Sequence, residues 1–93
     1  MGKLLKNKNG AQYYEITDKE LITCTSNSQP VCDHCLTSLL NKKDILLIPI
    51  LNMAFCRSCG EGALENIVSY PEEKYIEDRR IEYYNHQFKI GEK

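Results

Sequence analysis

The sequence predicts a small α+β domain, with short strands at the start and helices at the end. β-prone residues surround an Asn-Gly turn near the start, two Cys-x2-Cys pairs lie in the middle, and apolar residues recur at helical spacing in the last third. A chain of 93 residues predicts a single domain, 1–93. Its modest core is expected to need further stabilisation, such as a cross-link or a bound metal ion. Hydrophobic residues at 42% and charged residues at 27% are ordinary for a folded globular protein.

The first 30 residues predict an N-terminal β-hairpin or meander. Asn9-Gly10 is a strong signal for a hairpin turn. The stretch AQYYEIT that follows is β-prone, and so is ELITCTS, residues 20–26, which is rich in Ile, Thr and Leu. Residues 3–25 are therefore expected to form two or three antiparallel strands, followed by a loop over 26–30.

Residues 31–70 predict a buried hairpin followed by a helix. The apolar run Ile45–Phe55 contains Pro49, which excludes the interior of a helix and favours two short strands. After the hairpin, Leu64, Ile67 and Val68 recur at helical spacing. Pro71 is expected to end this helix near Tyr70.

The last segment, 71–93, predicts a C-terminal helix over about 72–88. Ile81, Tyr84 and Phe88 share one face at helical spacing, and most of the remaining positions are charged or polar. Gly91 is expected to close the helix.

Four of the five cysteines have the spacing of one structural zinc site. The two pairs are separated by a gap of 20 residues: Cys32, Cys35, Cys56 and Cys59. Two residues between paired cysteines allow a tight turn that directs both sulfurs to one tetrahedral ion at about 2.3 Å. Four thiolates close the coordination shell, so one structural Zn²⁺ is favoured over a catalytic ion.

Other interpretations of the cysteines are less consistent with the whole pattern. FCRSC alone resembles a thioredoxin-type redox motif, but two such pairs favour a metal. A rubredoxin-like iron site is disfavoured because Leu36, and not Gly, follows the first pair. Cys24 is expected to be a small buried hydrophobe, and His34 a surface neighbour of the site that is not a ligand.

The order of these elements resembles the treble-clef class of zinc domains. The matching parts are the knuckle at Cys32 and Cys35, the hairpin Ile45–Phe55, and the helix entered by Cys56 and Cys59. The resemblance implies a treble-clef-like unit over residues 31–70. A zinc ribbon, with the second pair on another hairpin, is the alternative.

The chain is also similar to small, largely uncharacterised four-cysteine zinc proteins of phages and mobile elements in bacteria. The similarity lies at Ile48–Leu51, Phe55–Cys59 and Tyr70–Glu73. It implies a small accessory protein that modulates a host or defence complex inside a bacterial cell.

The charge distribution disfavours a dedicated nucleic-acid binder. The formal net charge is −1, and a basic concentration occurs only at Lys3, Lys6 and Lys8. Residues 61–93 contain eight acids and five bases. Four thiolates around one Zn²⁺ would lower the net charge further, to −3, whereas nucleic-acid binding needs a basic surface.

We therefore expect a non-enzymatic protein-interaction module with a protein partner. Tyrosine and arginine are enriched at protein interfaces. The candidate partner-binding residues are Tyr70, Tyr75, Tyr83, Tyr84, Arg79 and Arg80. The competing interpretation is that these rings only pack the last helix onto the hairpin.

Two further function classes, a nucleic-acid binder and an enzyme, have less support in the sequence. A zinc-finger nucleic-acid-binding protein is the alternative, because Lys42, Lys43 and Arg57 flank the metal site. An enzyme is not expected, because the chain has no Ser/His/Asp grouping and no glycine-rich phosphate loop.

We expect a cytoplasmic protein without a membrane segment. The opening MGKLLKNKNG lacks the apolar region of a secretory signal. The longest apolar run is shorter than the roughly 18 residues that a membrane-spanning helix requires. In a reducing cytosol, cysteines favour metal binding over disulfides.

Overall fold

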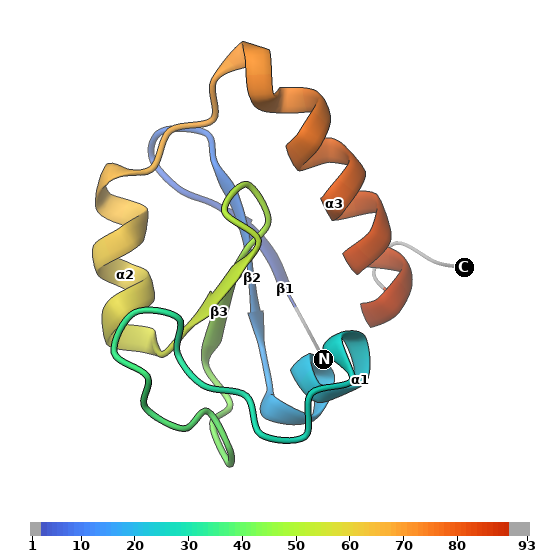
Figure 1. The fold of residues 1–93 in the computed structure, drawn as a ribbon. Helices are drawn as coiled ribbons and strands as arrows, with labels where there is room; N and C mark the ends of the chain where they lie inside the picture. Colours follow the sequence, from blue (N-terminus) through green and yellow to red (C-terminus); the bar gives the residue numbers. More distant parts are fainter. Residues whose placement is uncertain (1–2, 90–93) are drawn as a thin grey trace.

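The computed structural model describes residues 3–89 and shows an antiparallel sheet with three α-helices (Figure 1). The four strands follow the order β1-β2-β3-β4. Their bounds are β1 Lys3–Lys6, β2 Gln12–Ile16, β3 Ile45–Ile48 and β4 Met53–Phe55. The two predicted hairpins are therefore confirmed, and the β2–β3 pair joins them into one sheet.

The first hairpin is held by its turn residues. The Asn7 side-chain oxygen accepts from the N–H groups of Asn9 and Ala11 at 3.0 and 2.8 Å. Gly10 has φ +88°, a conformation that a residue without Cβ adopts at little cost. These contacts fix the register in which Leu4 lies opposite Tyr14.

The segment after β2 is a helix, so the prediction of a third N-terminal strand was wrong. α1, Asp18–Thr25, begins with a capping box. The Thr17 hydroxyl accepts from the Glu20 N–H at 3.3 Å, and the Glu20 carboxylate accepts from the Thr17 N–H at 3.1 Å. This reciprocal cap satisfies two backbone donors and outweighs the β-propensity of the segment.

Two longer elements complete the described chain. α2, Arg57–Asn66, is capped by Ile67 and so ends before the predicted Tyr70. A short 3-10 turn, η1 Pro71–Glu73, leads into α3, Lys74–Phe88, in agreement with the predicted helix over about 72–88. α3 ends at Phe88, and its C-cap residue Lys89 has φ +59°. The predicted terminator Gly91 lies outside the described residues.

α2 and α3 cover opposite faces of the sheet (Figure 1). Successive strand residues point to opposite faces. Leu46 faces α2, where Gly60 packs against it. Tyr14, which is paired with Leu47, faces α3 and forms edge contacts with Tyr84 and Phe88 at 5.9 and 5.2 Å. All four residues of β3 are consequently buried.

Two buried polar residues attach α3 to β2. The Tyr14 hydroxyl lies 2.6 Å from Asn85 Oδ1 and 3.1 Å from the Ile81 carbonyl. The fully buried Glu77 carboxylate accepts from the Gln12 N–H at 3.1 Å, and also from the Ser69 hydroxyl and the Lys74 ammonium. Because its hydrogen-bonding capacity is met, Glu77 is compatible with complete burial.

Candidate metal centre

The structure brings together the four cysteines predicted to bind metal. The Sγ atoms of Cys32, Cys35, Cys56 and Cys59 all lie within 4.8 Å of one another. Four sulfurs at about 2.3 Å from a tetrahedral ion lie about 3.8 Å apart. Cys35 Sγ and Cys56 Sγ, one from each pair, are 3.8 Å apart. The four residues are therefore arranged to bind a metal ion.

The first pair is positioned by a tight turn. The Leu36 N–H donates to the Cys32 carbonyl at 2.9 Å, and the Cys32 N–H donates to the Thr37 carbonyl at 2.9 Å. The His34 N–H points to Cys32 Sγ at 3.5 Å, as expected of an amide that stabilises a thiolate. Leu36 has φ +63°, a left-handed conformation that is unfavourable for a leucine.

Asp33 fastens this turn, which we call the knuckle (residues 32–37), to β4. The Asp33 N–H donates to the Ala54 carbonyl at 2.9 Å. The Ala54 N–H donates to the Asp33 carboxylate at 2.8 Å. The aspartate between the two cysteines thus brings the first pair to the strand that precedes the second pair. Sequence reasoning missed this role, because its backbone partner lies 21 residues away.

The second pair lies where β4 passes into α2. Cys56 is the N-cap of α2 and makes no side-chain capping bond, so its sulfur remains available to a metal ion. Cys59 lies in the first helical turn, and the Gly60 N–H donates to the Cys56 carbonyl at 2.8 Å. A zinc ribbon would require a second hairpin knuckle at this position, where the structure has a helix.

Gly60 allows the helix to approach the sheet. A Cβ at this position would lie 2.6 Å from Leu46 Cδ1 and 2.8 Å from Leu46 Cβ. The pattern Cys-x-x-Cys-Gly marks Gly60 in the sequence, but it does not predict that Gly60 packs against the sheet.

The pKa values of the four thiols move in different directions. Hydrogen bonds from the Thr37 side chain and backbone lower the pKa of Cys35 to about 6. Burial alone would raise the pKa of Cys32, but backbone N–H groups outweigh burial and lower it. The hydrogen bond with Cys56, followed by burial, raises the pKa of Cys59 to about 12. Four sulfurs this close cannot all be ionised without a cation between them.

Two other residues that could bind a metal ion, Cys24 and His34, lie outside the four-sulfur group. Cys24 is buried in α1 and is not a member of the four-sulfur group. Burial raises the pKa of its thiol to about 11. His34 is exposed, and its Nδ1 lies 3.5 Å from Cys59 Sγ, beside the cluster.

The residues proposed for partner binding divide into two groups. Tyr70, Tyr75 and Tyr83 are exposed, at 54%, 62% and 50%. Tyr84 is only 7% exposed and stacks on Phe88 at 5.9 Å. Helical spacing places residues 81, 84 and 88 on the face that packs on the sheet, so most of the Tyr84 ring is covered within the chain.

The two predicted arginines have different surroundings. The Arg80 guanidinium donates to the carbonyl oxygens of Pro49 and Ile50 at 2.9 and 3.1 Å. Arg79 is exposed. By contrast Arg57, which the nucleic-acid alternative invoked, pairs with Glu15 and Glu61, each at 2.8 Å.

Comparisons with protein-family models, with curated proteins and with solved structures gave no match to this chain. Within residues 3–89 no helix combines the length and the apolar character needed to cross a membrane.

Proposed function

We propose that one Zn²⁺ binds Cys32, Cys35, Cys56 and Cys59 and has a structural role. The observation that carries the proposal is the convergence of four sulfurs, from two separate segments, within 4.8 Å. An all-sulfur tetrahedral set suits zinc. Four thiolates leave no open position for a substrate or a water nucleophile, which supports a structural role over a catalytic one.

The segment that contains the first cysteine pair, residues 31–44, has little other stabilisation. Residues 31–44 form no helix or strand apart from the isolated bridge between Val31 and Ser38. Most of their side chains are exposed, with Cys32 and Leu39 the fully buried exceptions. A segment that buries so little apolar surface gains little from the hydrophobic effect. Zinc bound to its two cysteines would hold it against β4 and α2.

We further propose that the zinc unit is treble-clef-like and belongs to a non-enzymatic protein-interaction module. The sequence of knuckle, hairpin and helix supports the first part. The exposed tyrosines around η1 and α3 support the second, because large rings with polar tips are favoured at interfaces. A nucleic-acid interaction has less support, since the Arg57 charge near the site is engaged by two carboxylates.

An accessory role in a bacterial cell rests on the sequence resemblance alone. The resemblance lies at Ile48–Leu51, Phe55–Cys59 and Tyr70–Glu73. Affinity capture from a bacterial lysate, with and without nuclease treatment, tests it. A partner retained after nuclease treatment supports a protein target, and one lost on treatment supports nucleic acid instead.

The zinc proposal is tested by native mass spectrometry and near-ultraviolet circular dichroism. We expect one zinc per chain, and its removal by a chelator is expected to abolish the near-ultraviolet signal, because structural zinc contributes on the order of 10 kcal/mol in small domains. Cys56→Ser is expected to lose the metal. Cys24→Ala, which changes a cysteine outside the cluster, is expected to keep it.

Two results would overturn the zinc proposal. One is a metal-free protein that retains its near-ultraviolet signal and its resistance to proteolysis. The other is equal zinc content in Cys56→Ser and the parent protein.

A further inference from the structure

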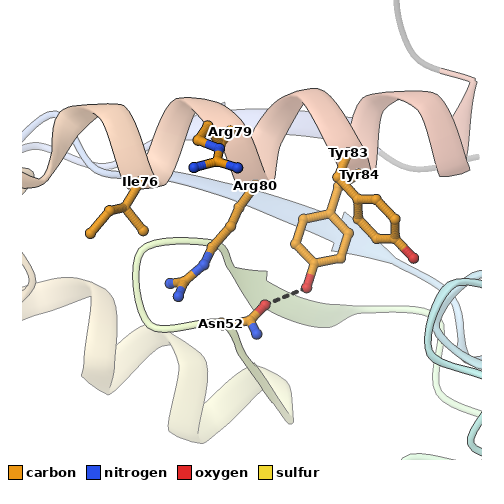
Figure 2. A pocket seen from close by; sticks show the side chains of 6 residues that line it. All are labelled: Asn52, Ile76, Arg79, Arg80, Tyr83 and Tyr84. Atoms are coloured by element: carbon orange, nitrogen blue, oxygen red, sulfur yellow. Dashed lines mark hydrogen bonds between the residues drawn. The ribbon is translucent and has the colours of Figure 1, made fainter.

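A groove lies between α3 and the turn that joins β3 to β4 (Figure 2). Its volume is about 470 Å³, within the range of sites that accept a peptide side chain or a small molecule. It is lined by Asn52, Ile76, Arg79, Arg80, Tyr83 and Tyr84.

Two arginines line the groove, and neither is held in a salt bridge within residues 3–89. Within this part of the chain, neither Arg79 nor Arg80 forms an ion pair, whereas Arg57 and Lys74 each pair with two carboxylates. The Arg80 contacts are neutral carbonyls that accept from one terminal nitrogen. Those carbonyls orient the guanidinium and leave its other N–H groups and its charge available to a ligand.

The aromatic walls of the groove are already positioned. The Tyr84 hydroxyl donates to Asn52 Oδ1 at 2.5 Å, a contact drawn in Figure 2. The Tyr83 hydroxyl donates to the Cys24 carbonyl at 3.2 Å and fixes a ring that is half exposed. Side chains held in this way lose little conformational entropy when a ligand binds. Ile76 adds an apolar surface beside them.

We propose that this groove binds an acidic segment of a partner protein. A carboxylate of the segment is held by Arg79 and Arg80, and an apolar neighbour packs against Ile76 and Tyr83. This inference rests on the proposed function as a protein-interaction module and gives the chemical class of the partner. Arginine recognises carboxylates through paired N–H donors, and tyrosine and arginine together are typical of interface hot spots.

The surroundings of the groove favour a peptide over nucleic acid. Glu82 lines an adjacent hollow together with Arg79, Tyr83 and His86. Asp78 lies on the same helix and is engaged by Lys74 at 2.9 Å. A continuous row of phosphates would meet these carboxylates, whereas an isolated carboxylate followed by an apolar side chain would not.

The test is a titration of the zinc-loaded, ¹⁵N-labelled protein followed by NMR at low salt. The probe is a short acetylated peptide in which a single glutamate is followed by leucine and flanked by alanine. We expect chemical-shift changes at residues 76–84 and 49–52. Arg79→Gln is expected to weaken binding about fivefold or more, because a charge-assisted hydrogen bond is lost. Lys42→Gln removes an exposed charge on another segment and is expected to change the affinity less than twofold.

Several results would overturn the groove proposal. They are equal binding of a peptide with glutamine in place of glutamate, an equal loss of affinity in the two variants, no shift change at these residues, or tighter binding of an oligothymidylate there. The Arg79 side chain forms no ion pair with other residues of the described chain, so Arg79→Gln is expected to remain folded. If a protein partner is captured equally by this variant, the groove proposal fails while the interaction module stands.

Discussion

At the scale of single residues, Gly60 connects the metal centre to the core. It follows the last ligand directly, and its bare Cα allows α2 to lie against Leu46. Gly62, two residues further along the same helix, has open space where a Cβ would project. Substitution of each glycine by alanine therefore distinguishes the effect of close packing on stability from the effect of helix propensity.

Gly60→Ala is expected to lower the free energy of unfolding of the zinc-loaded protein by about 1–2 kcal/mol, because overpacking exceeds the gain in helix propensity. Gly62→Ala is expected to raise it by up to about 1 kcal/mol, because alanine is the better helix former. Urea denaturation of both variants measures the difference. Equal shifts of the two midpoints in the same direction would show that contact with Leu46 does not restrict position 60.

Residue spacing predicted which cysteines come together, but not the residues that hold them in place. The pattern Cys-x2-Cys is local, so Cys32, Cys35, Cys56 and Cys59 are recognisable without a structure. The Asp33 clamp on Ala54 depends on a contact across 21 residues that no local pattern specifies. Thr37, which lowers the pKa of Cys35, is likewise identified as a support only by its position after folding.

At the scale of secondary-structure elements, α1 contains two conflicting sequence signals, a helix capping box and a high β-propensity. Thr17 and Glu20 have the Thr-x-x-Glu spacing of a capping box, and the structure contains both of its hydrogen bonds. The Ile and Thr content of the segment favoured a strand instead. Ile45–Phe55 posed no such conflict, because its apolar run and Pro49 both favour strands.

Thr17→Ala is expected to lower the free energy of unfolding by about 1 kcal/mol, because the Glu20 N–H loses its cap. Thr23→Ala, within the same helix, is the control. The Thr23 hydroxyl bonds to the Lys19 carbonyl at 2.9 Å on the exposed surface, so its removal is expected to change stability by less than about 0.5 kcal/mol. Equal losses in the two variants, measured by chemical denaturation, would contradict the capping role.

At the scale of the whole molecule, the sheet lies between two helices, and part of this was predictable. The continuous apolar run of β3 indicates a strand buried on both faces. The pairing of β2 with β3 was not predictable, because alternation along a strand does not identify its neighbour. Tyr14 lies at the centre of this arrangement, fully buried between β2 and α3.

The buried phenols give the protein a defined response to alkaline pH. Burial raises the pKa of Tyr14 and of Tyr84 above the ordinary phenol value of 10.0. Burial also raises the pKa of Cys24 from 9.0 to about 11. Above pH 9 to 10 the unfolded chain releases protons that the folded chain retains, so the free energy of unfolding is expected to fall as pH rises from there.

Tyr14→Phe is expected to make the free energy of unfolding less dependent on pH in the alkaline range. It is also expected to lower the free energy of unfolding by about 1 kcal/mol at neutral pH, because the hydrogen bonds to the Ile81 carbonyl and Asn85 Oδ1 are lost. Tyr75→Phe removes a hydroxyl from an exposed side chain and is the control at neutral pH. Urea denaturation of the zinc-loaded proteins between pH 8 and pH 11 measures both quantities. An unchanged slope in Tyr14→Phe would exclude its phenol as a source of the pH dependence.

The contact between the knuckle and β4 also covers an edge of the sheet that could otherwise pair with another chain. β4 is an edge strand, and Asp33 occupies the outward N–H and carbonyl groups of Ala54 at its centre. The other edge, β1, is short and has a lysine at each end, which discourages pairing with another sheet. Release of the knuckle would uncover the β4 backbone as a template for a second chain. A metal ion at the cysteines would therefore protect a sheet edge against aggregation.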